Sequence, residues 1–218
     1  PLMAWQVWRA LGLPTVATFH ATIPEHDSRT FSTRLLFASA KYFLSRMQAT
    51  IVPSVAPLVA LSRLTDKGNI LVLPPSINLA DWRSAGLNGH KSTGEAKSIL
   101  YLGRLEPRKG IDTLLKAWPV IAAKLPNTTL TIAGGGELER KVLSAQQAGD
   151  GRLIFVRQPD RKTALALAGN ADLLLATAQY GESFGLILLE AMAAGVVPIA
   201  AANSGYATVM TDEGAELL

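Results

Sequence analysis

Two glutamates stand eight positions apart in the C-terminal third of the chain, and both have the chemistry to contact a substrate. Glu182 lies in the segment GESFG (181–185), and Glu190 lies in the apolar segment that follows. We expect Glu182 on a loop before a helix and Glu190 about two turns inside that helix. A carboxylate among leucine, alanine and methionine is costly unless it is paired or bound to a ligand hydroxyl. Two glutamates without a substrate would show the same spacing if one interacted with the helix dipole and the other lay on the surface.

A basic segment, GRLEPRKG (103–110), follows an expected strand and begins an expected helix. It holds three cations, Arg104, Arg108 and Lys109. Helix N-termini attract anions through their free N–H groups and the helix dipole. Arginine and lysine are the side chains that bind phosphates, so the segment suits a diphosphate. A solvated basic turn has the same composition, and the residue order is not that of a Walker loop.

Two other features also follow expected strands. The glycines of 134–136 would let a ligand approach the backbone, although a plain tight turn needs them equally. They do not form the spaced-glycine fingerprint of dinucleotide-binding proteins. His20 is either a residue of a catalytic cleft or an ordinary turn residue.

Composition excludes several classes of protein. The chain has 218 residues, no cysteine, 49% apolar residues and 17% charged residues. It can bury a core and is not a disordered tail. Without cysteine it is no disulfide scaffold, zinc finger, iron–sulfur protein or cysteine-nucleophile enzyme. No run of 18 uncharged apolar residues occurs in the sequence, so no segment reads as a membrane span.

The charge is uneven along the chain. Residues 1–97 carry a net charge of +5 and residues 98–218 carry −1. The N-terminal part is therefore the one more suited to an anionic surface or substrate. The expected helix 29–47 contributes to this excess, because it has four basic residues and no acid. Its cationic face would suit anionic lipid. An ordinary half-buried helix with a basic outer face would have the same sequence pattern.

Apolar strands alternate with amphipathic helices from residue 98 onward, which predicts a doubly wound parallel sheet. The expected strands are 98–102, 129–133, 153–156, 172–176 and 197–201, and the expected helices are 110–125, 138–148, 161–168 and 184–194. In the first part we expect helices at 2–11, 29–47 and 55–65 and strands at 14–19, 50–52 and 70–73. Ligands of such sheets lie beyond the carboxyl ends of the strands.

Three regions follow from this pattern. Residues 1–83 read as a partial N-terminal α/β domain, and residues 84–97 as a Gly/Ser/Lys-rich linker. Residues 98–218 read as a second α/β domain. The chain starts at Pro1 without an initiator methionine and stops inside an expected element. We therefore expect a piece of a longer protein, truncated at both ends.

Taken together, these motifs resemble those of retaining glycosyltransferases of family 4 (group 1), which have the GT-B fold. The resemblance covers most of the chain. It rests on the basic segment 103–110, the glycines 134–136, the pair AD (171–172), GESFG (181–185) and EAMAAG (190–195). Within that family, residues 18–20 (TFH) and the run EPRKG (106–110) are similar to those of the bacterial phosphatidylinositol mannosyltransferases.

The resemblance implies a role for each matching residue. The donor diphosphate would be held by Arg104 and Lys109 and by the backbone of Ser183, Phe184 and Gly185. Catalysis would involve His20 and Glu182, and Glu190 would contact the ribose. The base would be held by the loop containing Arg157, Gln158 and Asp160. No metal and no cofactor beyond the nucleotide sugar is implied.

The implied function is transfer of a hexose, with mannose favoured, from a nucleoside-diphosphate sugar to an acceptor hydroxyl. GDP-mannose is the favoured donor, and a UDP- or ADP-sugar is the alternative. The acceptor would be a lipid of the phosphatidylinositol type or a glycan, with no nucleic acid partner. The resemblance places residues 1–83 on the acceptor side and 98–218 on the donor side. It also implies a cytoplasmic protein, peripheral at the inner face of the membrane through helix 29–47. Two alternatives remain, a nucleotide-sugar-binding module without transfer and a sugar-nucleotide epimerase.

Overall fold

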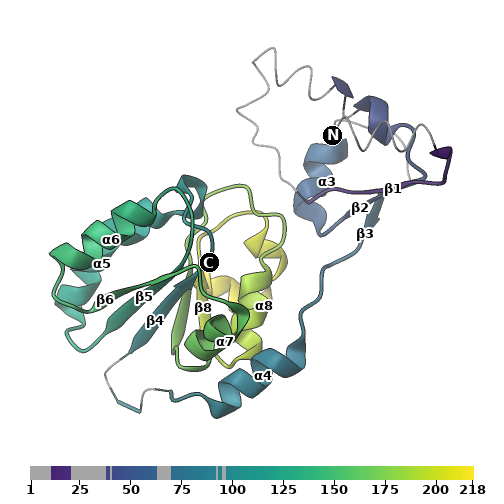
Figure 1. Cartoon of the computed structure of the whole chain (residues 1–218). Helices are drawn as coiled ribbons and strands as arrows, with labels where there is room; N and C mark the ends of the chain where they lie inside the picture. The colour runs from purple at the N-terminus through teal and green to yellow at the C-terminus, as the bar shows by residue number, and fades with distance from the viewer. Residues whose placement is uncertain (1–10, 21–37, 40, 63–69, 92, 95–96) are drawn as a thin grey trace. The chain divides into compact units, whose positions relative to one another are not determined.

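The computed structural model divides the chain into two compact units, Pro1–Pro75 and Ser76–Leu218 (Figure 1). The structure describes residues 11–20, 38–39, 41–62, 70–91, 93–94 and 97–218.

The first unit contains a parallel sheet in the order β1-β2-β3 (Val16–Thr18, Ala49–Val52, Ile70–Val72). Helix α3 (Val55–Ser62) follows β2. The fully buried side chains of its described core are Val52 and Leu61. Strands β1 and β3 lie within the ranges expected from the sequence, and β2 begins one residue earlier than expected.

The expected helix 29–47 is only partly covered by the described residues. Residues 38–39 and 41–44 are helical, whereas 29–37 and 40 lie outside the described part. Lys41 is exposed. The Arg46 guanidinium lies 3.6 Å above the Tyr42 ring and donates a hydrogen bond of 3.1 Å to the Tyr42 carbonyl. The expected helix 2–11 lies outside the described residues except for Leu11.

The second unit is built on a five-stranded parallel sheet in the order β6-β5-β4-β7-β8. Its strands are β4 (Ser98–Leu102), β5 (Thr129–Gly134), β6 (Leu153–Arg157), β7 (Leu173–Ala176) and β8 (Val197–Ala200). Its helices are α4 (Leu79–Asn88), α5 (Ile111–Lys124), α6 (Glu139–Ala148), α7 (Arg161–Gly169) and α8 (Leu186–Ala193). The doubly wound parallel sheet expected from residue 98 onward is confirmed, and the bounds agree to within two residues.

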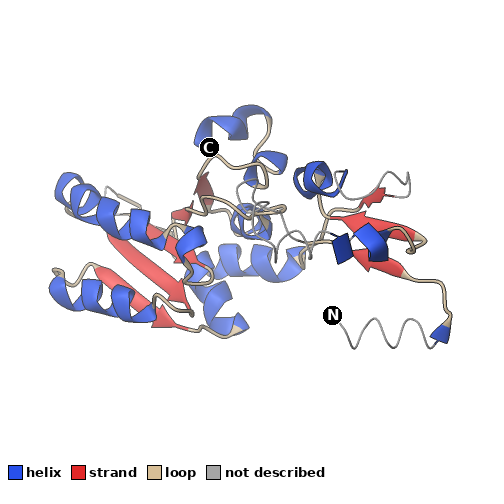
Figure 2. Cartoon of the chain, turned by 90° about the horizontal axis from the view of Figure 1, so that it is seen from above, coloured by secondary structure: helices blue, strands red, loops and turns tan. Residues whose placement is uncertain are grey.

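Helices cover both faces of this sheet, which is why its strands read as continuous apolar runs (Figure 2). Alternate residues of β4 point to opposite faces, so Ile99 and Tyr101 join the core formed with α5 and α6. Leu100 joins the opposite core, formed with α4, α7 and α8. The chain leaves β4 toward β5 and β6 and returns to β7 on the other side of β4. The strand order therefore reverses between β4 and β7, where sheets of this kind bind ligands.

The structure differs from the sequence-based division of the chain. The sequence places the end of the first domain at 83 and a linker at 84–97, whereas α4 runs to Asn88 and belongs to the second unit. Trp82 is buried in the core beside α7 and α8. An added Cβ at Gly86 would lie 2.3 Å from the Ala194 carbonyl oxygen. Gly86 and Gly89, which read as linker residues in the sequence, therefore lie where backbones approach closely.

We predict that Gly89→Ala lowers the free energy of unfolding of the second unit by about 1–3 kcal/mol, the usual cost of overpacking. A Cβ at Gly89 would lie 1.9 Å from the Gly169 carbonyl oxygen, so α4 and the end of α7 must move apart. Urea unfolding followed by circular dichroism measures the change.

The matched control for this substitution is Gly94→Ala, because a methyl group at Gly94 meets nothing within 4 Å. It should unfold at the same urea concentration as the native chain or a slightly higher one. Equal midpoints for the two variants would contradict the close packing of α4.

Candidate functional site

The loop after β4 is held in place by its backbone. It contains the short 3-10 helix η2 (Pro107–Lys109) and ends at Gly110, whose φ of +73° is in the left-handed region. An added Cβ there would lie 2.0 Å from the Thr177 carbonyl oxygen. The Thr177 hydroxyl donates a hydrogen bond of 2.7 Å to the Lys109 carbonyl. Both the conformation and the space at residue 110 therefore require glycine, and they hold Lys109 against the loop after β7.

The loop after β7 carries GESFG and leads into α8. The Gln179 N–H donates to the Arg108 carbonyl at 2.9 Å, which joins this loop to the loop after β4. Gly185 is the N-cap of α8, with a φ of +108°. On the opposite side, an added Cβ at Gly205 would lie 2.4 Å from the Glu182 carbonyl oxygen. The backbone of Glu182 is thus enclosed between two neighbouring loops.

A cluster of charged side chains lies where these two loops meet, and we call Glu106, Arg108, Lys109 and Glu182 the Glu182 cluster. The Glu182 carboxylate forms an ion pair with the Lys109 ammonium and lies 3.4 Å from Nη1 of Arg108. Nε of Arg108 also donates to Glu106 at 2.8 Å. The side chains of Glu182, Lys109 and Arg108 are only 13%, 19% and 24% exposed. Low exposure strengthens these electrostatic interactions relative to a surface pair.

Arg104 lies at the margin of this cluster. It forms an ion pair with Glu106 at 2.6 Å, and its side chain is 66% exposed. Of the two cations that the sequence assigns to a diphosphate, Lys109 is therefore enclosed and Arg104 faces solvent. Arg108, which the sequence does not assign, is the second enclosed cation. Spacing alone could not show which of the three cations of 103–110 points inward.

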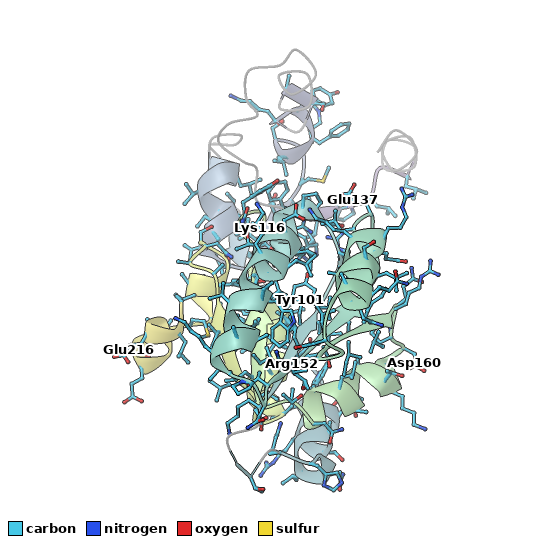
Figure 3. All side chains as sticks on the ribbon, turned by 90° about the vertical axis from the view of Figure 1, so that its left-hand side faces the viewer. Tyr101, Lys116, Glu137, Arg152, Asp160 and Glu216 are labelled. Carbon is cyan, nitrogen blue, oxygen red and sulfur yellow. The ribbon has the colours of Figure 1, made fainter. Side chains whose placement is uncertain are left out.

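Two buried tyrosines flank the cluster. Burial raises the pKa of Tyr101, and the negative charges of Glu182 and Glu106 raise it further. Burial and the charge of Glu182 likewise raise the pKa of Tyr206. The Tyr101 hydroxyl donates to the Arg104 carbonyl at 2.8 Å, inside the second unit (Figure 3). Both phenols therefore stay neutral at physiological pH.

Glu190 lies on α8 and is half-buried. Burial raises the pKa of its carboxyl group, and the positive charge of Arg161 partly offsets this effect. Within the described part of the chain, the structure gives the Glu190 carboxylate no hydrogen bond and no ion pair. A carboxylate in this position is well suited to accept a hydrogen bond from a ligand hydroxyl.

The glycines 134–136 bring two loops together. An added Cβ at Gly134 would lie 1.8 Å from the Gly103 carbonyl oxygen. The Leu105 N–H donates to the Gly135 carbonyl at 2.9 Å. Close backbone packing therefore explains these glycines without a ligand, in agreement with the tight-turn interpretation.

The residues expected at the base divide into two groups. Glu139 forms an ion pair with Nε of Arg157 at 2.7 Å and accepts a hydrogen bond from Gln158 at 3.3 Å. A hydrogen bond from the Gly136 N–H and the charge of Arg157 lower the pKa of Glu139. Asp160 instead accepts a hydrogen bond from the Thr163 N–H at 2.8 Å and caps α7, at the margin of the unit (Figure 3).

The structure thus brings together Lys109 and Glu182, with Ser183, Phe184 and Gly185 in the same loop and Glu190 on the helix that follows. His20 belongs to the first unit, where it is exposed directly after β1. Glu106 and Glu139 were not predicted from the sequence, and Arg108 was recognised only as one of the three cations of 103–110. Among the described residues, no group of three or more histidine and carboxylate side chains is placed to hold a metal ion. In the same residues, no helix has the length and hydrophobicity to span a bilayer.

We predict that Glu190→Gln stabilises the fold at neutral pH. Because the folded pKa of Glu190 is raised, the native state binds more protons than the unfolded chain between the ordinary and the raised pKa. Native stability therefore falls as the pH rises through that window, and the glutamine variant lacks this loss. Thermal unfolding at several pH values should show a gain at pH 7 that disappears below about pH 4. A gain that is independent of pH would contradict burial as its cause.

The chain is similar to proteins of a known family. A family model described as "Glycosyl transferases group 1" matches residues 87–218. A phosphatidyl-myo-inositol mannosyltransferase of Mycolicibacterium smegmatis is 30% identical over 216 residues, covering 97% of this chain and 53% of that protein. A glycogen synthase of Mycobacterium tuberculosis is 33% identical over 202 residues, covering 88% of this chain and 47% of that protein. The chain thus spans about half the length of the curated relatives that it matches.

Solved structures show the same fold. Anabaena HepE in complex with UDP-glucose superimposes with a TM-score of 0.76 at 19% identity, covering 97% of this chain and 59% of HepE. The lipopolysaccharide glycosyltransferase WaaG superimposes with a TM-score of 0.69 at 19% identity, covering 94% of this chain and 64% of WaaG. The GT-B type of α/β fold expected from the sequence is confirmed. The chain belongs to the glycosyltransferase group 1 family.

Proposed function

We propose that this chain forms part of a retaining hexosyltransferase that uses a nucleoside-diphosphate sugar. The observation that supports this proposal is the Glu182 cluster, in which two enclosed cations, Lys109 and Arg108, meet at the strand-order reversal between β4 and β7. The position where the strand order reverses is the usual ligand site of doubly wound sheets. Because the chain belongs to this family and has a relative named as a mannosyltransferase, we expect the ligand to be a glycosyl donor.

The donor would bind with its diphosphate over the loops after β4 and β7. Lys109 would supply a point charge, and Arg104, which faces solvent, would reach the outer phosphate oxygens. The backbone of Ser183, Phe184 and Gly185 leads into α8, whose first N–H groups have no acceptor within the helix. Anions are favoured at that position by the helix dipole.

The nucleoside would extend from the diphosphate along the carboxyl edge of the sheet. The Glu190 carboxylate, which has no other partner among the described side chains, would accept hydrogen bonds from the ribose hydroxyls. Arg157 and Gln158, joined through Glu139 after β6, would border the base. Asp160 would contribute by fixing the start of α7 and with it the end of this loop.

Transfer would break the bond between the anomeric carbon and the diphosphate oxygen through an oxocarbenium-like transition state. The negative charge that develops on the leaving diphosphate would be stabilised by Lys109, Arg104 and the start of α8, in place of a metal ion. Glu182 would position the sugar, and the departing phosphate would take the proton of the acceptor hydroxyl. We keep His20, which belongs to the first unit, as a proposed catalytic residue.

We favour mannose as the sugar, GDP-mannose as the donor and a phosphatidylinositol-type lipid as the acceptor. The relative from Mycolicibacterium smegmatis, matched along 97% of this chain, is named phosphatidyl-myo-inositol mannosyltransferase. A lipid acceptor would place the protein on the cytoplasmic face of a membrane, where the basic segment 29–47 would meet anionic lipid.

We predict that Lys109→Ala weakens binding of the matching nucleoside diphosphate by about ten- to a hundredfold, the usual range for a lost charged hydrogen bond to a phosphate. Calorimetric titration of the native chain with GDP, UDP and ADP measures the affinity and identifies the base. GDP is expected to bind most tightly.

The control for this titration is Lys116→Ala, which removes an exposed lysine of α5, labelled in Figure 3, and should leave the affinity unchanged. Full affinity of Lys109→Ala for GDP would refute the donor assignment. The transfer step itself is tested by incubating the full-length protein with GDP-mannose and phosphatidylinositol and following mannosyl-lipid formation.

A further inference from the structure

Lys109 and Arg108 are already neutralised inside the protein. The Glu182 carboxylate pairs with the Lys109 ammonium and lies 3.4 Å from the Arg108 guanidinium. Nη1 of Arg108 also lies 3.4 Å from the Gly181 carbonyl oxygen, and its Nε is bonded to Glu106. The same N–H groups that would hold a phosphate are therefore occupied by carboxylates.

A carboxylate and a phosphate compete for the same cation. Both accept charge-assisted hydrogen bonds from lysine and arginine in similar geometry. A diphosphate placed on Lys109 would lie beside the Glu182 carboxylate, and two anions at that distance repel strongly where side chains are less than a quarter exposed. Either the phosphate is excluded or the carboxylate must leave.

The carboxylate can leave without movement of its loop. The carbonyl of Glu182 lies so close to Gly205 that an added Cβ there would be 2.4 Å away, and the loop is bonded to Arg108 through Gln179. These contacts hold the backbone but do not hold the carboxylate. Rotation about the side-chain bonds of Glu182 moves the carboxylate away from Lys109 while the backbone stays in place.

We propose that Glu182 is an internal counter-ion, which occupies the phosphate position on Lys109 in the donor-free protein and is displaced by the donor diphosphate. This inference rests on the proposed donor site and adds a step to it. Displacement lowers the affinity for any anion that occupies only the phosphate position. Displacement also separates the Glu182 carboxylate from Lys109 when the donor binds. Glu182 therefore becomes free to position the sugar in the same step in which Lys109 binds the phosphate.

The experiment compares the binding of inorganic pyrophosphate and GDP to the native chain and to Glu182→Gln by calorimetry. Glutamine keeps the size of the side chain and removes its charge. We expect Glu182→Gln to bind pyrophosphate about tenfold more tightly than the native chain. The gain should disappear in the double variant Glu182→Gln/Lys109→Ala, because it acts through the freed lysine.

Glu216→Gln is the matched control, since it removes the same charge from an exposed side chain that points away from the unit (Figure 3). It should bind pyrophosphate like the native chain, which would exclude net charge as the cause. Circular dichroism verifies that each variant is folded. If Glu182→Gln does not fold, Glu182→Asp replaces it, because its shorter side chain withdraws the carboxylate from Lys109 and should give a smaller gain.

The outcomes separate this inference from the donor site on which it rests. Native binding of GDP, with equal or weaker binding by Glu182→Gln, would overturn the counter-ion and leave the donor site intact. Binding by Glu182→Gln alone, dependent on Lys109, would support the counter-ion even if the native chain bound no nucleotide. The absence of pyrophosphate and GDP binding by both proteins would overturn the counter-ion and the donor site together.

Discussion

The ion pair between Glu182 and Lys109 connects two loops that leave neighbouring strands, β4 and β7, at the point where the strand order reverses. Every feature that we assign to the donor is placed relative to this pair. Helix α8 begins at Leu186, four residues after Glu182, and Arg108 lies 3.4 Å from the same carboxylate. Folds of this kind bind ligands at the reversal, and here opposite charges lie close together at that position.

Backbone packing keeps these charges in place. Gly110 and Gly205 stand at points where any side chain would collide with the neighbouring loop, at Thr177 and Glu182 respectively. Lys109 and Glu182 are therefore attached to rigid backbone, and only their side chains have freedom to exchange partners. Burial of the Glu190 carboxylate costs free energy, because its pKa is raised and it makes no hydrogen bond or ion pair with the described residues. Such costs are typical of residues kept for a ligand.

The sheet of the second unit could be predicted from the sequence because its strands are buried on both faces and therefore read as unbroken apolar runs. The motifs around Lys109 and Glu182 could be found for the same reason, since each follows such a strand. The orientation of side chains within a loop could not be predicted. Arg104 and Arg108 have the same chemistry and similar spacing, and only the fold shows that Arg108 is enclosed and Arg104 exposed. Helix α4 was missed because Gly86 and Gly89, which allow it to pack on α7 and α8, are typical of linkers.

The central claim is that nucleoside diphosphate binds where the loops after β4 and β7 meet. Amide chemical shifts of the isotope-labelled chain, followed during titration with GDP, test this directly. The account predicts shifts concentrated at Lys109–Gly110 and Ser183–Gly185, with smaller ones at Glu190 and at Arg157–Gln158. It also predicts unchanged amides in the C-terminal parts of α4 and α5, which lie away from the carboxyl edge of the sheet. Shifts concentrated in those helices, with the loop at Lys109 unaffected, would contradict the account.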